Sequence, residues 1–126
     1  MTMEDSDFML ELKNYPETRQ FAIQTQDEIK KEDHERWLKD NLIWFKVAEG
    51  YNGPVGAVRI FGGEISIWVH RNFRGLGVAT QIIKEVSTPG MIARIVDGNT
   101  SSMRAFVKAG YLTNNHIENY YTLRYQ

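Results

Sequence analysis

The chain has 126 residues, no cysteine and a formal net charge of −1 at pH 7. This length predicts one domain, residues 1–126, able to bury a core without disulfides or structural metals. The lack of cysteine excludes disulfides, thiolate metal sites and a cysteine nucleophile, and the balanced charge argues against nucleic-acid binding. No apolar run approaches the ~20 residues of a membrane span, and the acidic N-terminus lacks the regions of a signal peptide. We therefore expect a cytoplasmic protein without membrane partners.

The N-terminal third predicts helical or irregular structure. Residues 5–13 are rich in apolar side chains but too few for periodicity to decide between strand and helix. A turn is expected at 14–17, with Pro16 opening the next short segment, and 18–25 is ambiguous. Residues 27–41 predict an amphipathic helix whose other side carries charged residues. Its expected buried residues are Ile29, Trp37 and Leu38, and His34 is expected at the surface.

The middle of the chain predicts an antiparallel meander. Residues 43–49, 55–61 and 64–69 have strand composition, and Asn-Gly and Gly-Gly turn sequences lie between them. A helix is expected from Val78 to about Ser87, where Thr88-Pro89-Gly90 stops it. Residues 91–96 predict a fourth strand, and the helical crossover before it predicts that this strand runs parallel to the third.

The C-terminal part predicts one more helix and two strands. Residues 97–102 form a polar loop rich in capping residues, and the apolar spacing that follows predicts a helix with Gly110 just past its end. Residues 111–113 and 120–125 predict closing strands around a loop that holds His116. The order of elements predicts an α+β sandwich around a mixed sheet.

The most informative stretch is the strand, glycine turn and helix start over residues 65–83. A helix that begins on a bare glycine turn points several unpaired N–H groups at one place, an anion site that phosphate commonly occupies. One interpretation is a dinucleotide site made by Gly75, Gly77 and Asp97. Thr80 stands where the third glycine would be, and the chain lacks the repeated strand–helix units of that fold.

The other interpretation is a coenzyme A pyrophosphate cradle. The turn resembles the Gln/Arg-x-x-Gly-x-Gly/Ala signature of the GNAT N-acetyltransferase superfamily, matched by Arg74, Gly77 and Ala79. Residues 99–111 resemble the family's Asn-x-x-Ser/Ala-x-x-x-Tyr/Phe-x-Lys-x-Gly-Phe/Tyr block, in the expected order. The resemblance implies a GNAT-type mixed, mostly antiparallel sheet with helices on both faces. It also places residues 8–12 in a helix, so that the usual first strand is missing and a second copy could pair with the uncovered sheet edge to form a homodimer.

The resemblance implies an acetyl-CoA-dependent N-acetyltransferase that needs no metal. Such an acyltransferase moves an acetyl group from acetyl-CoA directly to a primary amine of a small molecule. Residues 12–19 and 32–38 are similar to segments of amino-sugar acetyltransferases, which makes a nucleotide-linked amino sugar a candidate acceptor. Acetylation of a peptide or protein N-terminus and a non-catalytic acyl-CoA-binding module are the alternatives.

The resemblance also assigns residues to the cofactor. The pantetheine arm is expected between the third and fourth strands on backbone groups of 67–69, and the pyrophosphate on N–H groups of 75–80. A backbone N–H near Val69 is expected to meet the oxyanion. The expected cofactor-binding residues are Ile67, Trp68, Val69, Arg74, Gly75, Leu76, Gly77, Val78, Ala79, Thr80, Asn99, Ser102 and Phe106.

Catalytic residues are harder to assign. Phe106 replaces the tyrosine that often protonates the leaving thiolate, and Arg94 occupies the position of a glutamate base in some protein acetyltransferases of the family. Glu64 and His70, at the two ends of the third strand, are the candidate catalytic residues. Structural alternatives stay open: a solvated hairpin end for Glu64, a surface residue for His70 and a helix N-cap for Asn99.

Overall fold

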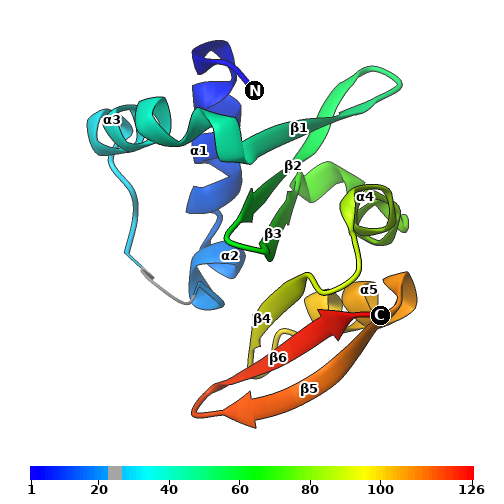
Figure 1. The fold of residues 1–126 in the computed structure, drawn as a ribbon. Coiled ribbons are helices and arrows are strands. Elements are labelled where there is room, and N and C mark those ends of the chain that lie inside the picture. The colour runs from blue at the N-terminus through cyan, green and yellow to red at the C-terminus, as the bar shows by residue number, and fades with distance from the viewer. Residues whose placement is uncertain (23–26) are drawn as a thin grey trace.

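The computed structural model describes residues 1–22 and 27–126, which form a six-stranded sheet with helices on both faces (Figure 1). The strands lie in the order β1-β2-β3-β4-β6-β5. Short 3-10 turns occupy Met3–Asp5, Leu42–Trp44 and Arg71–Phe73. The helices and strands are α1 (Ser6–Asn14), α2 (Pro16–Gln20), α3 (Lys31–Asn41), β1 (Phe45–Gly50), β2 (Gly53–Phe61), β3 (Glu64–Val69), α4 (Val78–Val86), β4 (Ile92–Val96), α5 (Thr100–Ala109), β5 (Tyr111–Ile117) and β6 (Tyr120–Tyr125).

The predicted meander and crossover are confirmed. β1, β2 and β3 pair antiparallel, and β4 runs parallel to β3 after α4. Residues 8–12 lie in α1, and Pro16 opens α2. Among the described residues no strand precedes β1, so β1 is an edge of the sheet, as the resemblance implied.

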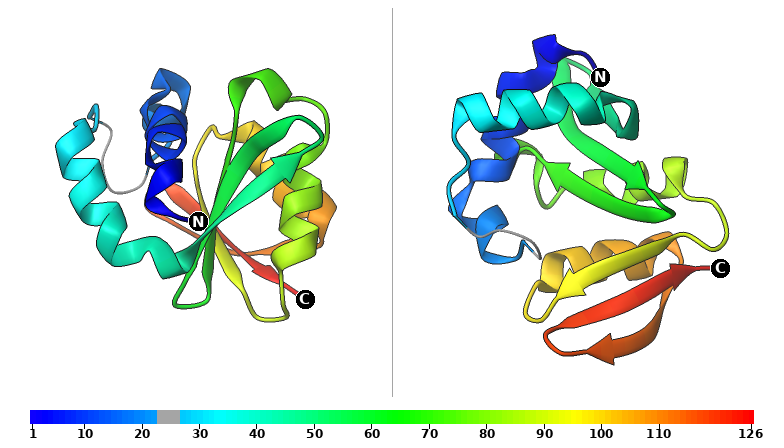
Figure 2. Two further views of the ribbon diagram at one scale, coloured as in Figure 1. Left: turned by 90° about the horizontal axis from the view of Figure 1, so that it is seen from above. Right: turned by 60° about the vertical axis from the view of Figure 1, so that its left-hand side comes forward.

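Two apolar cores lie on opposite faces of the sheet. On one face, Met9 and Leu12 of α1 and Leu38 of α3 pack over Phe45 and Ala57. On the other face, α4 and α5 bury the second core, which includes Val58, Ile65, Ile83, Ile95, Phe106, Tyr111 and Leu123. Figure 2 shows α1 and α3 on one side of the strands, with α4 and α5 on the other. Strand alternation therefore decides which core each sheet residue faces.

The expectation for residues 27–41 needs correction. The helix begins only at Lys31, so that Ile29 precedes it, and 39% of Trp37 is exposed. His34, expected at the surface, is 2% exposed, because it lies one turn before Leu38 on the side that meets α1. Burial lowers the pKa of His34 to about 4, and the positive charge of Lys13 contributes. Of the ambiguous residues 18–25, those from 23 onward lie outside the described residues.

The prediction of a loop around His116 is also wrong. Residues 114–116 continue β5, with an irregularity in the pairing register between Thr113 and Asn115. The turn follows at Glu118 and Asn119, where Glu118 has a φ of 54°. His116 is exposed as predicted, and its Nε2 lies 2.8 Å from Asp97 Oδ1. Among the described residues no helix has the length and apolar character needed to cross a membrane.

Candidate functional site

The parallel pair β3–β4 is joined at one place. Glu64 and Ile92 are its single pair of Cα partners, next to the hydrogen bond that Ile92 N–H donates to Gly63 O at 2.9 Å. By contrast, every residue of β3 has a Cα partner in β2, and every residue of β4 has one in β6. Figure 1 shows β1–β3 and β4–β6 as two groups of strands that meet near this point. Among residues 1–22 and 27–126, the remainder of β3 therefore has no partner strand on its β4 side.

Strand alternation fixes which backbone groups of β3 face that side. His70 N–H donates to Val55 O at 2.7 Å, on the β2 side. In an antiparallel ladder successive residues direct their N–H and C=O groups to opposite edges. Ile67 and Val69 therefore direct theirs toward β4, in line with the bond that Gly63 O accepts from Ile92, whereas Trp68 directs its own toward β2. Ile67, Trp68 and Val69 were expected to hold pantetheine. The backbone groups of Ile67 and Val69 point to the β4 side, as that role requires, and those of Trp68 do not.

The glycine turn at the end of β3 leads directly into α4. Gly75 and Gly77 have φ values of 80° and 77°, a left-handed conformation that glycine adopts at little cost. Gly77 is the N-cap of α4, and the first bond within the helix runs from Gln81 N–H to Gly77 O at 3.1 Å. The N–H groups of 78–80 thus lack acceptors within the helix. A Cβ at either glycine would meet no atom within 4 Å, so the space over the turn is open to a ligand.

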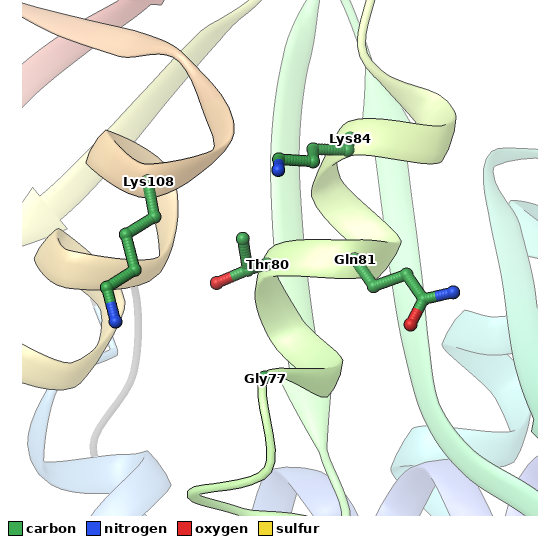
Figure 3. Close-up of a pocket in the computed structure, with 5 residues that line it drawn as sticks. All are labelled: Gly77, Thr80, Gln81, Lys84 and Lys108. Carbon is green, nitrogen blue, oxygen red and sulfur yellow. The ribbon is translucent and has the colours of Figure 1, made fainter.

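A hollow of about 380 Å³ lies beside this helix start, between α4 and α5 (Figure 3). Gly77, Thr80, Gln81 and Lys84 of α4 line it, together with Lys108 of α5. Among the described residues neither lysine has a carboxylate within ion-pair distance. The sequence analysis did not assign Gln81, Lys84 or Lys108 to the cofactor, although Lys84 follows Thr80 by one helical turn and therefore shares its face. Unpaired ammonium groups beside a free helix N-terminus suit an anion.

Arg74 is paired with α2 in this structure. Its Nη1 donates to Glu17 Oε2 at 2.9 Å, and its Nε donates to Val69 O at 3.3 Å. Arg71 donates to both oxygens of the same carboxylate at 2.9 Å. The hydrogen bond from Arg71 is the main reason that the pKa of Glu17 is lowered to about 2. Glu17 therefore ties the segment between β3 and α4 to α2 and offsets the charge of Arg74.

Both ring nitrogens of His70 are engaged. Nδ1 accepts from Asn72 N–H at 3.1 Å, so the ring proton lies on Nε2, which donates to Glu11 Oε2 at 2.9 Å. Tyr15 OH donates to the same oxygen at 2.5 Å. The ring also stacks on Phe8, with centroids 6.1 Å apart. In this arrangement His70 has no unoccupied lone pair with which to accept a proton from an amine.

Glu64 is paired with Arg94. Arg94 Nε lies 3.0 Å from both carboxylate oxygens, and the guanidinium carbon lies 5.8 Å from the centre of the Tyr120 ring. Hydrogen bonding to Glu64 raises the pKa of Arg94. Glu64 shares the α1/α3 face of β3 with Trp68, since Ile65 between them belongs to the opposite core. The structure does not bring Glu64 and His70 together, because they lie at opposite ends of β3.

A second hollow of about 230 Å³ lies where β4 leads into α5. Ile95, Val96, Gly98, Asn99, Thr100, Met103 and Tyr121 line it. Asn99 is the N-cap of α5, since its Oδ1 accepts from Ser102 N–H at 3.4 Å. Phe106 is 3% exposed and packs edge-on against Tyr111, with ring centroids 5.0 Å apart. In this structure Asn99 and Ser102 form a helix cap and Phe106 is part of the core. Among the described residues no group of three or more histidines and carboxylates could hold a metal ion.

Several solved structures that superpose on this chain are acetyltransferases. Spermidine N-acetyltransferase from Vibrio cholerae, in complex with CoA and spermine, superposes with a TM-score of 0.81 at 12% identity, covering 98% of this chain and 89% of that one. The structure of AAC(6')-Ib with ribostamycin and coenzyme A gives 0.80 at 13% identity, covering 100% and 90%. The acetyltransferase (GNAT family) from Bacillus anthracis gives 0.76 at 18% identity, covering 98% and 88%. No protein-family model and no curated protein matches the sequence. The chain thus has the GNAT fold, as the two sequence blocks implied.

Proposed function

We propose that this chain is an acetyl-CoA-dependent N-acetyltransferase that acetylates a primary amine of a small molecule. The observation that carries the proposal is the unpaired edge of β3 beside the glycine turn. Ile67 and Val69 direct hydrogen-bonding groups to that edge, where the pantetheine arm would add as a strand does. The N–H groups of 78–80 and the two lysines would hold its phosphates.

The chemistry requires little beyond positioning. The amine nitrogen attacks the thioester carbon, a C–N bond forms, the C–S bond breaks with its electron pair on sulfur, and one amine proton leaves to a base. Acetyl-CoA supplies the thioester. We propose that Val69 N–H stabilises the oxyanion, because it points to the unpaired edge. Our candidates for the base are His70 and Glu64. His70 directly follows Val69 but must first be released by Glu11. Glu64 lies at the other end of β3 and must first be released by Arg94, so it would take the proton through bridging water molecules.

The acceptor and the assembly are further parts of the proposal. A nucleotide-linked amino sugar is our candidate acceptor, on the resemblance of residues 12–19 and 32–38 to amino-sugar enzymes. The uncovered edge of β1 supports pairing of two copies there. A non-catalytic acyl-CoA-binding module is the second candidate function, favoured by the buried Phe106, which has no proton to give to the thiolate.

A thermal-shift titration with acetyl-CoA, coenzyme A and NAD tests the cofactor. A ligand at about 100 times its Kd stabilises the folded state by about 2.7 kcal/mol, which appears as several degrees in a domain of this size. We expect a shift with acetyl-CoA and coenzyme A and none with NAD. A shift with NAD alone, or with none of the three, would contradict the proposal. Coenzyme binding without coenzyme A release over a broad panel of amines would favour the non-catalytic module.

The lysines of the larger hollow give a second test. We expect Lys84→Ala and Lys108→Ala each to weaken coenzyme A binding about 3- to 10-fold, or about 0.7–1.4 kcal/mol, because each removes a cation from the phosphate site. The loss should shrink as salt is raised, since both groups are solvent-exposed. Calorimetric titrations at low and high ionic strength measure both effects. Lys46→Ala, an exposed lysine on β1, is the matched control. Wild-type affinity for coenzyme A in both Lys84→Ala and Lys108→Ala would mean that the phosphates do not bind in this hollow.

A further inference from the structure

Two cations lie together among aromatic rings on the α1/α3 face of the sheet. Lys13 Nζ of α1 is 3.9 Å from the centre of the Trp37 ring and 5.4 Å from that of Phe45. The guanidinium carbon of Arg59, on β2, lies 5.7 Å and 6.0 Å from the same two ring centres. It also lies 4.9 Å from the centre of the Phe61 ring. Trp37 and Phe45 thus lie beside both charges and Phe61 beside Arg59, and we call this group of two cations and three rings the cationic basin.

The basin has no negative charge of its own. Among residues 1–22 and 27–126, no carboxylate lies within ion-pair distance of Lys13 or Arg59. Arg59 Nε is buried and has no acceptor among those residues. Burial and repulsion from Arg59 lower the pKa of Lys13 to about 8. Aromatic faces offset only part of the cost of two desolvated cations. A ligand with negative charge would supply what the protein lacks.

The basin adjoins the face from which an acceptor would reach the unpaired edge of β3. Lys13 Nζ lies 5.9 Å from the ring centre of Trp68, whose neighbours Ile67 and Val69 line that edge. Arg59 pairs across the sheet with Ser66, and Ser66 lies on the same face as Glu64, two positions earlier in β3. The rings at the outer end are open to solvent, since Trp37 is 39% and Phe61 48% exposed. A small molecule can therefore contact the basin and Glu64, one of the two candidate bases, together.

We propose that Lys13 and Arg59 bind an anionic group of the acceptor, so that the substrate is an amine that also carries a carboxylate or a phosphate. This inference rests on the proposed function and narrows its acceptor class. The basin repels polycationic amines, because two unpaired positive charges face them in a site of reduced dielectric. Polyamines and aminoglycosides are thus poor acceptors for this chain, although solved structures that share its fold contain spermine and ribostamycin.

Matched acceptor pairs test the inference. Coenzyme A release from acetyl-CoA is followed with glucosamine 6-phosphate against glucosamine, with glycine against glycinamide, and with spermidine. Within each pair the amine is kept and only the anionic group differs. We expect the anionic member of at least one pair to have a kcat/KM at least 10-fold higher than its neutral partner, and spermidine to be poor. The phosphate and carboxylate pairs separate the two sources of negative charge. Equal rates within both pairs, or a preference for spermidine, would overturn the inference.

Substitution identifies the residues responsible. Lys13→Met and Arg59→Met keep an unbranched apolar side chain among the rings but remove the charge. We expect each variant to lose most of the kcat/KM preference for the anionic acceptor. The loss should come from a higher KM for that acceptor, with little change in kcat or in coenzyme affinity. Lys46→Met is the control, because it removes one positive charge from the exposed side of β1 facing away from the basin. Retention of the preference in both basin variants would contradict the assignment.

Binding without turnover separates this inference from the proposed function. Trp37 and Trp68 flank Lys13, so glucosamine 6-phosphate or glycine should change the tryptophan fluorescence of the wild type but not of Lys13→Met. Glucosamine and glycinamide should change the fluorescence of neither protein. Equal responses within both pairs, or no response to either anionic acceptor, would overturn the inference. An intact fluorescence response with no thermal shift from acetyl-CoA would instead mean that the basin is correct and the proposed function is wrong.

Discussion

Replacing Gly77 with valine is expected to weaken acetyl-CoA binding at least 100-fold, or about 2.7 kcal/mol. Valine would have to adopt the φ of 77° at this position, and its side chain would enter the open space above the helix start. Left-handed backbone costs a residue with a Cβ about 1–2 kcal/mol, so some loss of folding stability is also expected. Calorimetric titration and urea unfolding measure the two effects separately.

Gly63→Val is the matched control. Gly63 has a φ of 78°, and an added Cβ there also meets nothing within 4 Å, so the backbone strain is the same. It lies in the β2–β3 turn, at the other end of β3 from the cradle. We expect both variants to lose similar stability and only Gly77→Val to lose the coenzyme. Equal affinities in the two variants would show that the glycine turn holds no phosphate.

A second large effect is expected from pH. Protonation of His34 is disfavoured in the folded state, where its pKa is lowered to about 4, and proceeds freely in the unfolded chain near pH 6.5. A lowered histidine pKa leaves stability intact above pH 6.5 and removes it as the pH falls from 6.5 toward 4. The loss amounts to about 3 kcal/mol at the acid end of that range. Urea unfolding at a series of pH values from 7 to 4 measures it.

The diagnostic comparison is with His34→Gln, which cannot titrate. Its absolute stability can differ from that of the wild type, so the readout is the slope of unfolding free energy against pH. We expect a flatter slope between pH 6.5 and 4 in His34→Gln than in the wild type. Parallel slopes in the two proteins would mean that His34 is protonated as easily inside the fold as outside it.

The features predicted correctly from the sequence are those that local chemistry dictates. An Asn-Gly sequence placed the β1–β2 turn and a Gly-Gly sequence the β2–β3 turn, and a β-strand composition placed β3 to the residue. The bare turn before Val78 marked the N-terminus of α4 because only glycine reaches its backbone angles cheaply. Helical spacing placed α5 and its glycine end. Each of these needs only residues close together in the chain.

Long-range pairings could not be predicted from the sequence. Arg74 was expected at the phosphates, and in this structure it is paired with Glu17, 57 residues away. Lys13 and Arg59 lie on separate elements and come together because α1 packs on the face of the sheet that carries Phe45 and Ala57. His34 lies in a charged helix, and its burial depends on how α1 packs against it. No spacing rule within one element encodes such contacts.

The single bridge between β3 and β4 divides the sheet into two mechanical units of three strands each. Within the described residues, the α4/α5 core, with Ile65 on one side and Leu123 on the other, and the Glu64–Arg94 ion pair span both units. A ligand arm lying along β3 would close the seam between them with hydrogen bonds. Amide hydrogen exchange should therefore slow along Ile67 and Val69 on binding, far more than along the already paired β5–β6. If the proposal is correct, the coenzyme would act as a seventh strand between β3 and β4 and would join the two halves of the sheet.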